Sequence, residues 1–541
     1  MCYSQLTTDH GLTTETPNMI FSSPHPAVNI PELSLTEFVL QRAPEFGAKP
    51  ALIDGVTGRT VTYAELSPTI HRLAAGFAAH GLSKGDVLAI YSPNLPEYAL
   101  AFHAVALLGG VTTMVASLFT GDEIKTQLRD SAAKYLLTVP QLFEQAREAA
   151  KHSHIEEIFV IGSVAGAISF DSLLENDSAL PGLSINPCDD IVALPYSSGT
   201  TGFPKGVMLT HRNLVSMLCQ IRTNDPLTQQ DTMICVVPMY HLYGLHVVVN
   251  LALCQGATVV TLPRYELDQF LRTLERYKVT VAPLVPPLVL TLARAPEVES
   301  YDLSRLRLIH CGAASLPASI AQECIQRLGC HIRYGYGLTE VSPLSHASVP
   351  SSPDEPDSVG YCLPNTECKI IDLTRGAELG PNEEGEICLR GPQVMKGYLG
   401  NPQATAEMID SQGWLRSGDI GYADEDGRLF VVDRLKELIK YKGRQVAPAE
   451  LEAVLLSHPA IADAGVIASP DEKAGEVPKA FVVLKDKATA DEIIEFVAVR
   501  VAPHKRIRAV EFVSEIPKSP AGKILRRVLV QRERAKLAPR S

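Results

Sequence analysis

The sequence lacks paired cysteine motifs: its 11 cysteines are scattered, and no Cys-x-x-Cys pair occurs. A zinc site is therefore disfavoured, and the odd number of thiols indicates reduced, mostly buried side chains. The N-terminal segment MCYSQLTTDHGLTTETPN has no basic start followed by an apolar run, so we expect a mobile tail and not a signal peptide. Together these absences predict a cytoplasmic protein.

The sequence also lacks an excess of positive charge, since its formal net charge is -12. This disfavours nucleic acid as the main partner. The charge is uneven: residues 434–541 hold 21 Lys and Arg against 14 Asp and Glu, whereas residues 1–433 hold 28 against 47. A basic C-terminal piece on an acidic body is either a solvated face or a lid that meets polyanionic ligands.

No segment reads as a transmembrane helix. The most apolar stretch, Ala99–Phe119, is about long enough to span a bilayer, but Gly109 and Gly110 divide it and its second half is rich in Val and Thr. A buried helix, a glycine turn and a strand explain it better.

The 541 residues are too many for one hydrophobic core, so at least two domains are expected. Val- and Ile-rich runs at 85–92, 156–162, 232–238, 257–262 and 307–312 alternate with helical patterns, which predicts parallel sheets covered on both faces. From about Gly360 the pattern changes to short strands and a hairpin at Asp426-Gly427, indicating a small antiparallel, barrel-like lobe.

A further α+β unit is predicted after Asp433, opening with a helix that starts at Pro448. Strands near 463–468, 478–484 and 509–513 and a helix near 489–500 complete it. The predicted fold class is therefore α/β, with a large N-terminal domain and a mobile C-terminal α+β domain. The expected boundaries are a tail at 1–30, a large domain at 31–433 and a small lid domain at 434–541.

The segment Tyr196–Asn213, YSSGTTGFPKGVMLTHRN, concentrates hydroxyls, glycines and one lysine. Glycines let backbone N–H groups line a concavity, and Lys205 adds a point charge, so the loop is suited to phosphate. It is not a Walker A loop, because Lys205 lies between Pro204 and Gly206 and no Ser or Thr follows it to hold magnesium. A glycine-rich surface hairpin is the structural alternative.

With its SSGTTGFPKGV and GEICLRG (385–391) segments, the sequence resembles the acyl-adenylate-forming enzymes, and within them the 4-coumarate–CoA ligases of bacterial cinnamate–CoA ligase type. The resemblance runs from about Pro31 to Arg527. It implies that the large domain binds ATP, Mg²⁺ and a carboxylic acid and forms an acyl-AMP. The small domain then rotates and admits CoA.

The resemblance also implies the nucleotide site. Tyr336 offers a ring face to adenine, Thr339 a hydroxyl near the α-phosphate, Asp419 a carboxylate for the ribose hydroxyls and Glu340 an oxygen ligand for Mg²⁺. The full set of implied ATP and AMP contacts is Ser197, Ser198, Gly199, Thr200, Thr201, Gly202, Lys205, Tyr334, Gly335, Tyr336, Thr339, Asp419, Arg434, Lys436 and Gln445.

Three residues are expected to be catalytic. Lys523, in IPKSPAGKILRR, would stabilise charge that develops on the α-phosphate, His241 would position the carboxylate, and Lys440 would contact the adenylate. Lys436 would be the hinge. On its own, a lone histidine such as His241 is more often structural, and a charged stretch such as 434–445 is more often solvated surface.

The acid and CoA sites follow from the same resemblance. Tyr243 should stack on a flat ring, while Gly244 and Gly335 leave width for it. The expected acyl-binding residues are Tyr243, Gly244, Ala313, Gly335, Pro343 and Leu344. The expected CoA-binding residues are Arg264, Lys442 and Gly443.

Several positions depart from the coumarate-ligase pattern. Tyr334 stands where Gln is usual, Ser315 where Pro is usual, Arg444 where Phe is usual and Arg264 where Lys is usual. Val247 stands where plant ligases often carry Ser, which leaves a preference for a para-hydroxyl open.

The sequence therefore predicts an ATP-dependent, AMP-forming acid–CoA ligase for a cinnamic-type acid such as 4-coumarate. The alternatives are a medium- or long-chain fatty acyl-CoA ligase and an adenylation enzyme that loads a carrier protein. A luciferase-type oxygenase or a catalytically inactive binding protein fits the motifs less well. We expect small-molecule partners, no nucleic acid, no membrane span, and a monomer or homodimer.

Overall fold

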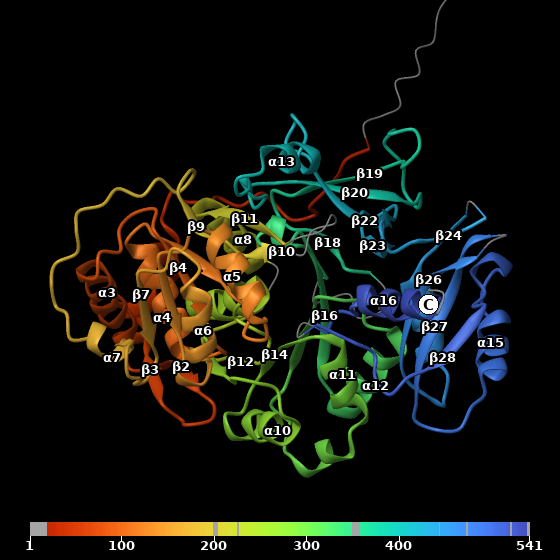
Figure 1. Cartoon of the computed structure of the whole chain (residues 1–541), viewed down its shortest axis with the longest axis horizontal. Coiled ribbons are helices and arrows are strands. Elements are labelled where there is room, and N and C mark those ends of the chain that lie inside the picture. Colours follow the sequence, from red (N-terminus) through yellow and green to blue (C-terminus); the bar gives the residue numbers. More distant parts are fainter. Residues whose placement is uncertain are drawn as a thin grey trace, which may run out of the picture.

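The structure, a computed structural model, describes residues 19–197, 204–223, 227–348, 358–442, 444–471, 474–519 and 522–537, and the side chain of Gln445 lies outside this description. Four sheets organise these residues. Two large α/β sheets lie side by side, a small antiparallel sheet lies beside them, and the C-terminal sheet stands at one end of the molecule (Figure 1).

The first large sheet is parallel in its centre, as the alternating pattern predicts. Its order is β10-β11-β9-β5-β4-β6-β7-β8, with β21 paired to β11. The strands are β4 (Val87–Tyr91), β5 (Val111–Met114), β6 (Tyr135–Thr138), β7 (Glu157–Val160), β8 (Ile168–Ser169), β9 (Ile191–Ala193), β10 (Tyr196–Ser197), β11 (Lys205–Thr210) and β21 (Gly397–Tyr398).

The second large sheet has the order β18-β17-β16-β15-β14-β12-β13-β2-β3 and is parallel from β16 to β2. The strands are β2 (Pro50–Asp54), β3 (Thr60–Thr62), β12 (Thr232–Cys235), β13 (Thr258–Thr261), β14 (Val281–Leu284), β15 (Leu308–Cys311), β16 (His331–Tyr336), β17 (His346–Ala347) and β18 (Tyr361–Cys362).

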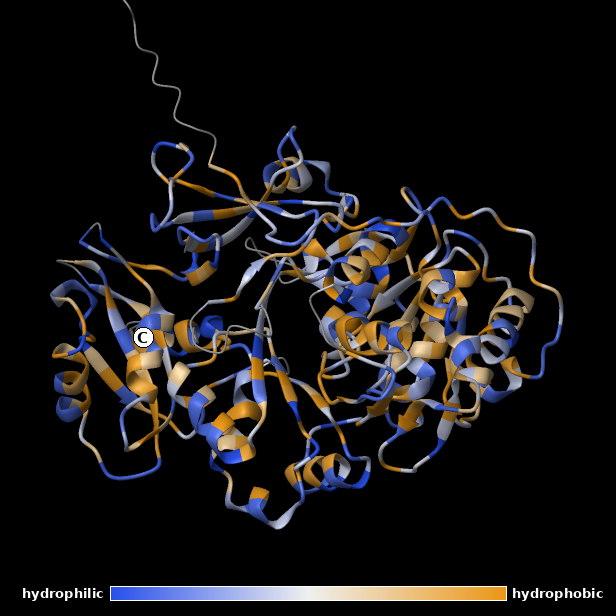
Figure 2. Cartoon of the chain, turned by 180° about the vertical axis from the view of Figure 1, so that it is seen from behind, coloured by the Kyte–Doolittle hydropathy of each residue, from blue (hydrophilic) through white to orange (hydrophobic). Residues whose placement is uncertain are grey.

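Helices cover both faces of these sheets because alternate strand residues are buried on opposite sides. In β4, Leu88 and Ile90 belong to a core shared with α3 (Tyr63–Ala79) and α4 (Pro96–Leu107), whereas Ala89 and Tyr91 face α5 (Gly121–Asp130) and α6 (Phe143–Ala150). The helices carry alternating hydrophobic and hydrophilic bands (Figure 2). The remaining helices of the large lobes are α1 (Leu35–Leu40), α2 (Ala43–Phe46), α7 (Phe170–Leu173), α8 (His211–Arg222), α9 (Leu251–Gln255), α10 (Leu267–Arg276), α11 (Pro286–Arg294), α12 (Ala318–Leu328) and α13 (Pro402–Met408).

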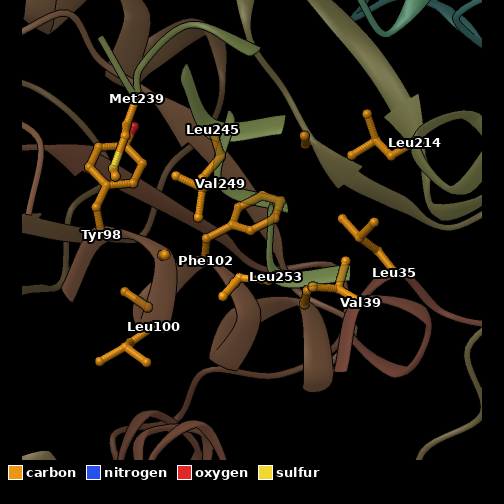
Figure 3. Packing of buried hydrophobic residues seen from close by; sticks show 14 of the residues in the cluster. Leu35, Val39, Tyr98, Leu100, Phe102, Leu214, Met239, Leu245, Val249 and Leu253 are labelled. Atoms are coloured by element: carbon orange, nitrogen blue, oxygen red, sulfur yellow. The ribbon is translucent and has the colours of Figure 1, made fainter. Parts of the chain in front are cut away.

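The apolar stretch Ala99–Phe119 forms the predicted helix, turn and strand. Residues Pro96–Ala106 of α4 are all buried. The helix crosses the core, which explains why its apolar residues are not confined to one face. Phe102 packs toward Leu245 and Val249 in this core (Figure 3). Gly109 then turns the chain with a φ of 67°, and β5 follows. In the part of the chain that the structure describes, no helix combines the length and apolarity that a bilayer crossing requires.

The antiparallel lobe and the C-terminal unit also match the sequence pattern. The third sheet has the order β1 (Phe21–Ser22), β19 (Glu367–Ile371), β20 (Gly385–Arg390), β22 (Leu415–Ala423) and β23 (Leu429–Arg434). The fourth contains β24 (Ile439–Tyr441), β25 (Arg444–Val446), β26 (Ile461–Asp471), β27 (Gly475–Leu484) and β28 (Ala509–Phe512), with α14 (Pro448–Leu456), α15 (Ala490–Ala498) and α16 (Arg526–Leu537). Strands β26 and β27 are longer than predicted because they form one continuous antiparallel hairpin.

Candidate active site

The phosphate-loop segment is framed by strands, as its sequence predicts. Strand β10 pairs with β11, which brings Ser197 opposite Lys205, and α8 begins after the N-cap Thr210. The loop residues between them lie outside the described residues, namely Ser198, Gly199, Thr200, Thr201 and Gly202, and so does Gly443. Their assignment to phosphate and CoA stays a prediction.

Asp419 is the centre of one polar cluster. It lies on β22 with a side chain only 7% exposed, and Arg434 on β23 places its Nε 3.2 Å from Oδ1. The hydroxyl of Tyr336, at the end of β16, donates to Oδ2 at 2.7 Å. Burial raises the pKa of Asp419, although Arg434, Tyr336 and Lys523 all oppose that shift. The carboxylate is thus held in one orientation, as recognition of a vicinal diol requires.

Lys523 belongs to the same cluster. Its loop approaches the large lobe closely: Gly522 has a φ of 75°, and a Cβ there would lie 2.9 Å from Cδ of Pro287 on α11. The Nζ of Lys523 lies 4.0 Å from Oε1 of Glu437, and burial together with Arg434 lowers the pKa of Lys523 to about 8. A glycine at position 522 therefore lets the C-terminal unit bring an ammonium beside the large lobe.

Glu340 is the centre of a second cluster. It lies in the 3₁₀ turn Thr339–Val341 and is 5% exposed. Its Oε1 accepts hydrogen bonds from the hydroxyls of Ser197 at 2.7 Å and Tyr398 at 2.8 Å. Mg²⁺ prefers hard oxygen donors, and the buried carboxylate of Glu340 is one that hydroxyl groups orient beside the phosphate-loop segment. These residues therefore fit the implied cation.

Tyr243 marks a third region, where a helix with π-type hydrogen bonding (Tyr243–Asn250) begins. Its hydroxyl donates to the carbonyl oxygen of His310 at 2.8 Å, and a Cβ on Gly312 would lie 3.5 Å from Cζ of Tyr243. The Tyr243 ring is therefore fixed by its hydroxyl, and it borders Gly312, the glycine that directly follows β15 (Leu308–Cys311). His241 lies two residues before Tyr243; its side chain is partly exposed, and desolvation by the surrounding protein lowers its pKa.

Gly244 corrects one detail of the acyl-site prediction. A Cβ at this position would lie 2.3 Å from the carbonyl oxygen of Pro238, so the missing side chain permits close backbone packing and does not widen a slot. A Cβ on Gly335 would lie 2.9 Å from Cδ1 of Leu344, so this glycine permits the close approach of Leu344, and its acyl-binding role stays a prediction. Pro343 follows Ser342 in a cis peptide bond.

Ala313 and Tyr334 flank this region. Ala313 has a φ of 72°, a left-handed conformation uncommon for a residue with a Cβ, directly after β15. Tyr334 lies on β16, and its backbone N–H donates to Oγ of Ser348 at 2.9 Å.

The hinge and CoA residues are only partly brought to these clusters. Burial lowers the pKa of Lys436, and the nearby positive charge of Lys205 lowers it further. Lys440 and Lys442 are exposed on the β24–β25 hairpin, where Nζ of Lys442 lies 5.6 Å from the Tyr441 ring centroid. The expected adenylate contact of Lys440 stays a prediction.

Arg264 lies on the surface, where its side chain is 85% exposed and lies 3.8 Å from Glu266. Its expected contact with CoA stays a prediction. Two residues that were not predicted from the sequence lie in the clusters around Glu340 and Lys523. Tyr398 contacts Glu340, which is 58 positions away, and Glu437 contacts both Lys523 and Arg526. Only the pairing of distant segments reveals them, although Glu437 stands inside the charged stretch that the sequence singles out.

Comparison with known proteins gives consistent matches over nearly the whole chain. A model described as AMP-binding enzyme matches residues 39–399, and one described as AMP-binding enzyme C-terminal domain matches residues 450–523. The chain is 42% identical over 539 residues to 4-coumarate--CoA ligase 2 of Solanum tuberosum, covering 97% of this chain and 98% of the relative. It is 43% identical over 535 residues to 4-coumarate--CoA ligase 2 of Nicotiana tabacum, covering 96% and 98%.

Solved structures agree. The crystal structure of an anthranilate CoA ligase in complex with anthranoyl-AMP superposes with a TM-score of 0.88 at 25% identity, covering 94% of this chain and 98% of that one. An o-succinylbenzoate CoA synthetase from Bacillus subtilis, in complex with its acyl-adenylate intermediate, superposes with a TM-score of 0.80 at 32% identity, covering 92% and 98%.

Proposed function

Since the chain belongs to the AMP-binding enzyme family, we propose that it is an ATP-dependent acid–CoA ligase whose substrate is a cinnamic-type aromatic acid such as 4-coumarate. The observation that carries the proposal is the 42% identity to a 4-coumarate–CoA ligase across 97% of this chain. The reaction consumes ATP and CoA and releases pyrophosphate and AMP.

The first half-reaction joins the acid to AMP. A carboxylate oxygen attacks the α-phosphorus of ATP, and the bond to pyrophosphate breaks. Negative charge grows on the α-phosphoryl oxygens, and the ammonium of Lys523, held beside Asp419 and Glu437, is placed to stabilise it. Asp419 and Arg434 orient the ribose, and Lys205 meets the phosphates. Glu340 would hold Mg²⁺, and the bound cation would supply neutralisation of the phosphate charge.

The second half-reaction transfers the acyl group. The CoA sulfur attacks the acyl carbonyl carbon, the carbonyl carbon–phosphate oxygen bond breaks, and AMP leaves while the thiol proton passes to solvent. We propose that rotation about Lys436 withdraws Lys523 and brings the exposed β24–β25 hairpin, with Lys442 and Gly443, to the CoA path. The exposure of Lys440 and Lys442 in the present orientation supports two positions of residues 434–541.

Tyr243 is proposed to form one wall of the acyl slot, with Gly335 and Leu344 on another side. Its hydroxyl is engaged by a backbone carbonyl, so the apolar ring face is the surface offered to an aromatic acid. His241 is proposed to meet the carboxylate. The cytoplasm is the proposed compartment, because the cysteines within the described residues are all free thiols.

The test is product analysis with purified protein, ATP, Mg²⁺ and 4-coumarate, with and without CoA. The proposal predicts AMP and pyrophosphate in equal amounts and 4-coumaroyl-CoA when CoA is present, and enzyme-bound 4-coumaroyl-AMP when CoA is absent. Formation of ADP and phosphate, or no dependence of pyrophosphate release on the acid, would contradict it.

A further inference from the structure

A buried chain of hydrogen bonds ties the helix with π-type hydrogen bonding to three other helices. Nε2 of His246 donates to the carbonyl oxygen of Leu214 on α8 at 3.0 Å, and Nδ2 of Asn250 donates to Nδ1 of His246 at 3.0 Å. Nε2 of His103 on α4 donates to Oδ1 of Asn250 at 3.1 Å, and the hydroxyl of Thr36 on α1 donates to Nδ1 of His103 at 3.1 Å. His246 and Asn250 both belong to the π-type helix, which is therefore connected to α1, α4 and α8 through one continuous chain.

The direction of this chain is set by its last acceptor. The carbonyl oxygen of Leu214 can only accept, so His246 carries its proton on Nε2 and its Nδ1 accepts. Asn250 must then donate through Nδ2 and accept through Oδ1, so His103 also carries its proton on Nε2. Burial lowers the pKa of His246 to about 3 and that of His103 to about 4, which keeps both rings neutral. Each of the two histidines is thus restricted to one tautomer.

The chain lies within an apolar core. The side chains of Thr36, His103, His246 and Asn250 are at most 3% exposed. The apolar residues next to them in sequence, such as Phe102, Leu245 and Val249, pack together in this core (Figure 3). A buried polar group that loses its partner destabilises the fold, whereas a fully hydrogen-bonded network allows only one arrangement of its members. The chain therefore fixes the geometry of the π-type helix more narrowly than apolar packing would.

The first residue of the π-type helix is Tyr243, whose ring forms a wall of the proposed acyl slot. Its hydroxyl is held by the carbonyl oxygen of His310 at 2.8 Å. The backbone N–H of Leu251 donates to the carbonyl oxygen of His246, five residues earlier, whereas an α-helix uses the carbonyl four residues earlier. A change to α-type bonding would rotate Tyr243 relative to His246 and Asn250 about the helix axis. The position of the ring therefore depends on the π-type form.

We propose that His246 and Asn250 are positioning residues for the acid substrate. Through their hydrogen bonds to α4 and α8 they keep the helix in its π-type form, and this form sets where the Tyr243 ring stands in the acyl slot. Neither side chain needs to touch the acid, because each acts through the backbone of the helix that carries Tyr243. The inference rests on the proposed function, which assigns that slot to an aromatic acid.

Three substitutions interrupt the chain without adding charge to the core. His246→Leu removes the bonds to Leu214 and Asn250, and Asn250→Leu removes the bonds to both histidines with little change in volume. Thr36→Val removes only the hydroxyl at the start of the chain and keeps the shape of the side chain. It is the variant to use where the leucine variants do not fold.

Gln127→Leu, on α5, is the matched control. Nε2 of Gln127 donates to Oγ1 of Thr113 and to the carbonyl oxygen of Met114, both at 3.0 Å, and Gln127 is 3% exposed. Like Asn250→Leu, this substitution replaces a buried, hydrogen-bonded amide with an apolar side chain. It should lower the urea midpoint of unfolding without changing the selection of the acid.

Acid-dependent pyrophosphate release measures KM for 4-coumarate, KM for ATP, and the ratio of kcat/KM for cinnamate to kcat/KM for 3,4-dimethoxycinnamate. His246→Leu and Asn250→Leu should raise KM for 4-coumarate roughly tenfold and lower the ratio, the scale of a small misplacement in a binding site, while KM for ATP stays within about twofold of wild type. Thr36→Val should raise KM for 4-coumarate about threefold. Hydrogen exchange followed by mass spectrometry should show faster exchange of residues 243–250 in all three variants.

Unchanged selection of the acid would overturn the inference. If the folded variants keep KM for 4-coumarate and the cinnamate ratio within about twofold of wild type, the chain only stabilises the core, even where exchange of residues 243–250 is faster. Equal changes in Gln127→Leu would also overturn it, because they would follow from lost stability alone. A wild-type protein without acid-dependent pyrophosphate release rejects the proposed function itself, and this inference with it.

Discussion

Asp419 and Arg434 are direct partners across the β22–β23 ladder, and Nε of Arg434 lies 3.2 Å from Oδ1 of Asp419. Because the two strands are held in register, the carboxylate and the guanidinium form one rigid unit beside Lys523. A ribose bound here would therefore meet a group that its neighbours already orient.

Replacing Asp419 should therefore weaken ATP binding with little change in fold. Asp419→Asn removes the charge that would strengthen the proposed hydrogen bonds to the ribose hydroxyls, and we expect KM for ATP to rise roughly tenfold to a hundredfold, the range of one charge-assisted bond. Steady-state kinetics at saturating 4-coumarate measure this. Asp424→Asn is the control, because it breaks an Asp–Arg pair at 2.7 Å in the same hairpin. An equal rise in both variants would assign the effect to the hairpin's stability.

The depressed pKa of Lys523 predicts an alkaline limit on adenylation. Burial and Arg434 lower this pKa to about 8, so the ammonium is present below that pH and is lost as the pH rises through it. The kcat/KM for acid-dependent pyrophosphate release without CoA should fall about tenfold per pH unit above pH 8. In Lys523→Arg the side chain stays charged, so any remaining activity should not fall above pH 8. The same fall in kcat/KM in both proteins would contradict the assignment of the alkaline limit to Lys523.

The two half-reactions should respond differently to Lys523 and Lys436. Lys523→Ala should lose adenylation by roughly a hundredfold or more, the scale of one transition-state charge contact, yet convert supplied cinnamoyl-AMP and CoA at a near-normal rate. Lys436→Pro fixes φ at the proposed hinge, so adenylate should form and thioester should not. Single-turnover assays with supplied acyl-AMP separate the steps. Equal loss of both steps in Lys523→Ala would exclude two positions of residues 434–541.

A buried histidine should make stability depend on pH. The backbone N–H of Leu35 donates to Nδ1 of His211 at 3.0 Å, and burial lowers the pKa of His211 to about 4. The unfolded chain binds a proton at a pKa near 6.5, so His211 contributes stability above about pH 6.5 that is lost as the pH falls toward 4. His211→Asn places an oxygen acceptor near Nδ1 and should reduce this loss by on the order of 1–3 kcal/mol at pH 4.5.

Urea unfolding at pH 7.5 and pH 4.5 measures the difference. His154→Asn, at an exposed position, is the control and should follow the wild-type pH dependence. A His211→Asn protein that loses as much stability as wild type between the two pH values would exclude His211 as a source of the pH dependence.

Much of the fold follows from local sequence. Alternation of buried strands and helices predicts the parallel sheets, the two glycines after Leu108 predict the turn into β5, and Asp426-Gly427 predicts the β22–β23 hairpin, where Gly427 has a φ of 82°. Each of these signals acts within a few residues. The helix with π-type hydrogen bonding at Tyr243–Asn250 was not predicted, because its hydrogen-bond pattern does not change the side-chain chemistry of the segment.

The site is predicted less completely, because its contacts join distant segments. Motif matching selects Asp419, Glu340 and Lys523 one by one, but their neighbours Tyr398 and Glu437 become visible only when β21 is paired with β11 and Lys523 is placed beside the hinge segment. Gly244 was misinterpreted for the opposite reason. Its place in a motif suggested that it leaves room in a pocket, whereas a side chain there would meet the carbonyl oxygen of Pro238.

Acid-dependent pyrophosphate release over a panel of cinnamates, benzoates and fatty acids, with and without CoA, tests the central claim most directly. The account predicts that cinnamate and 4-coumarate have the highest kcat/KM, ahead of heavily methoxylated rings, because the proposed acyl slot between Leu344 and the Tyr243 ring is apolar and flat. Hexanoate or a longer fatty acid exceeding every cinnamate by roughly tenfold, about the discrimination that one pocket methylene supplies, would contradict it.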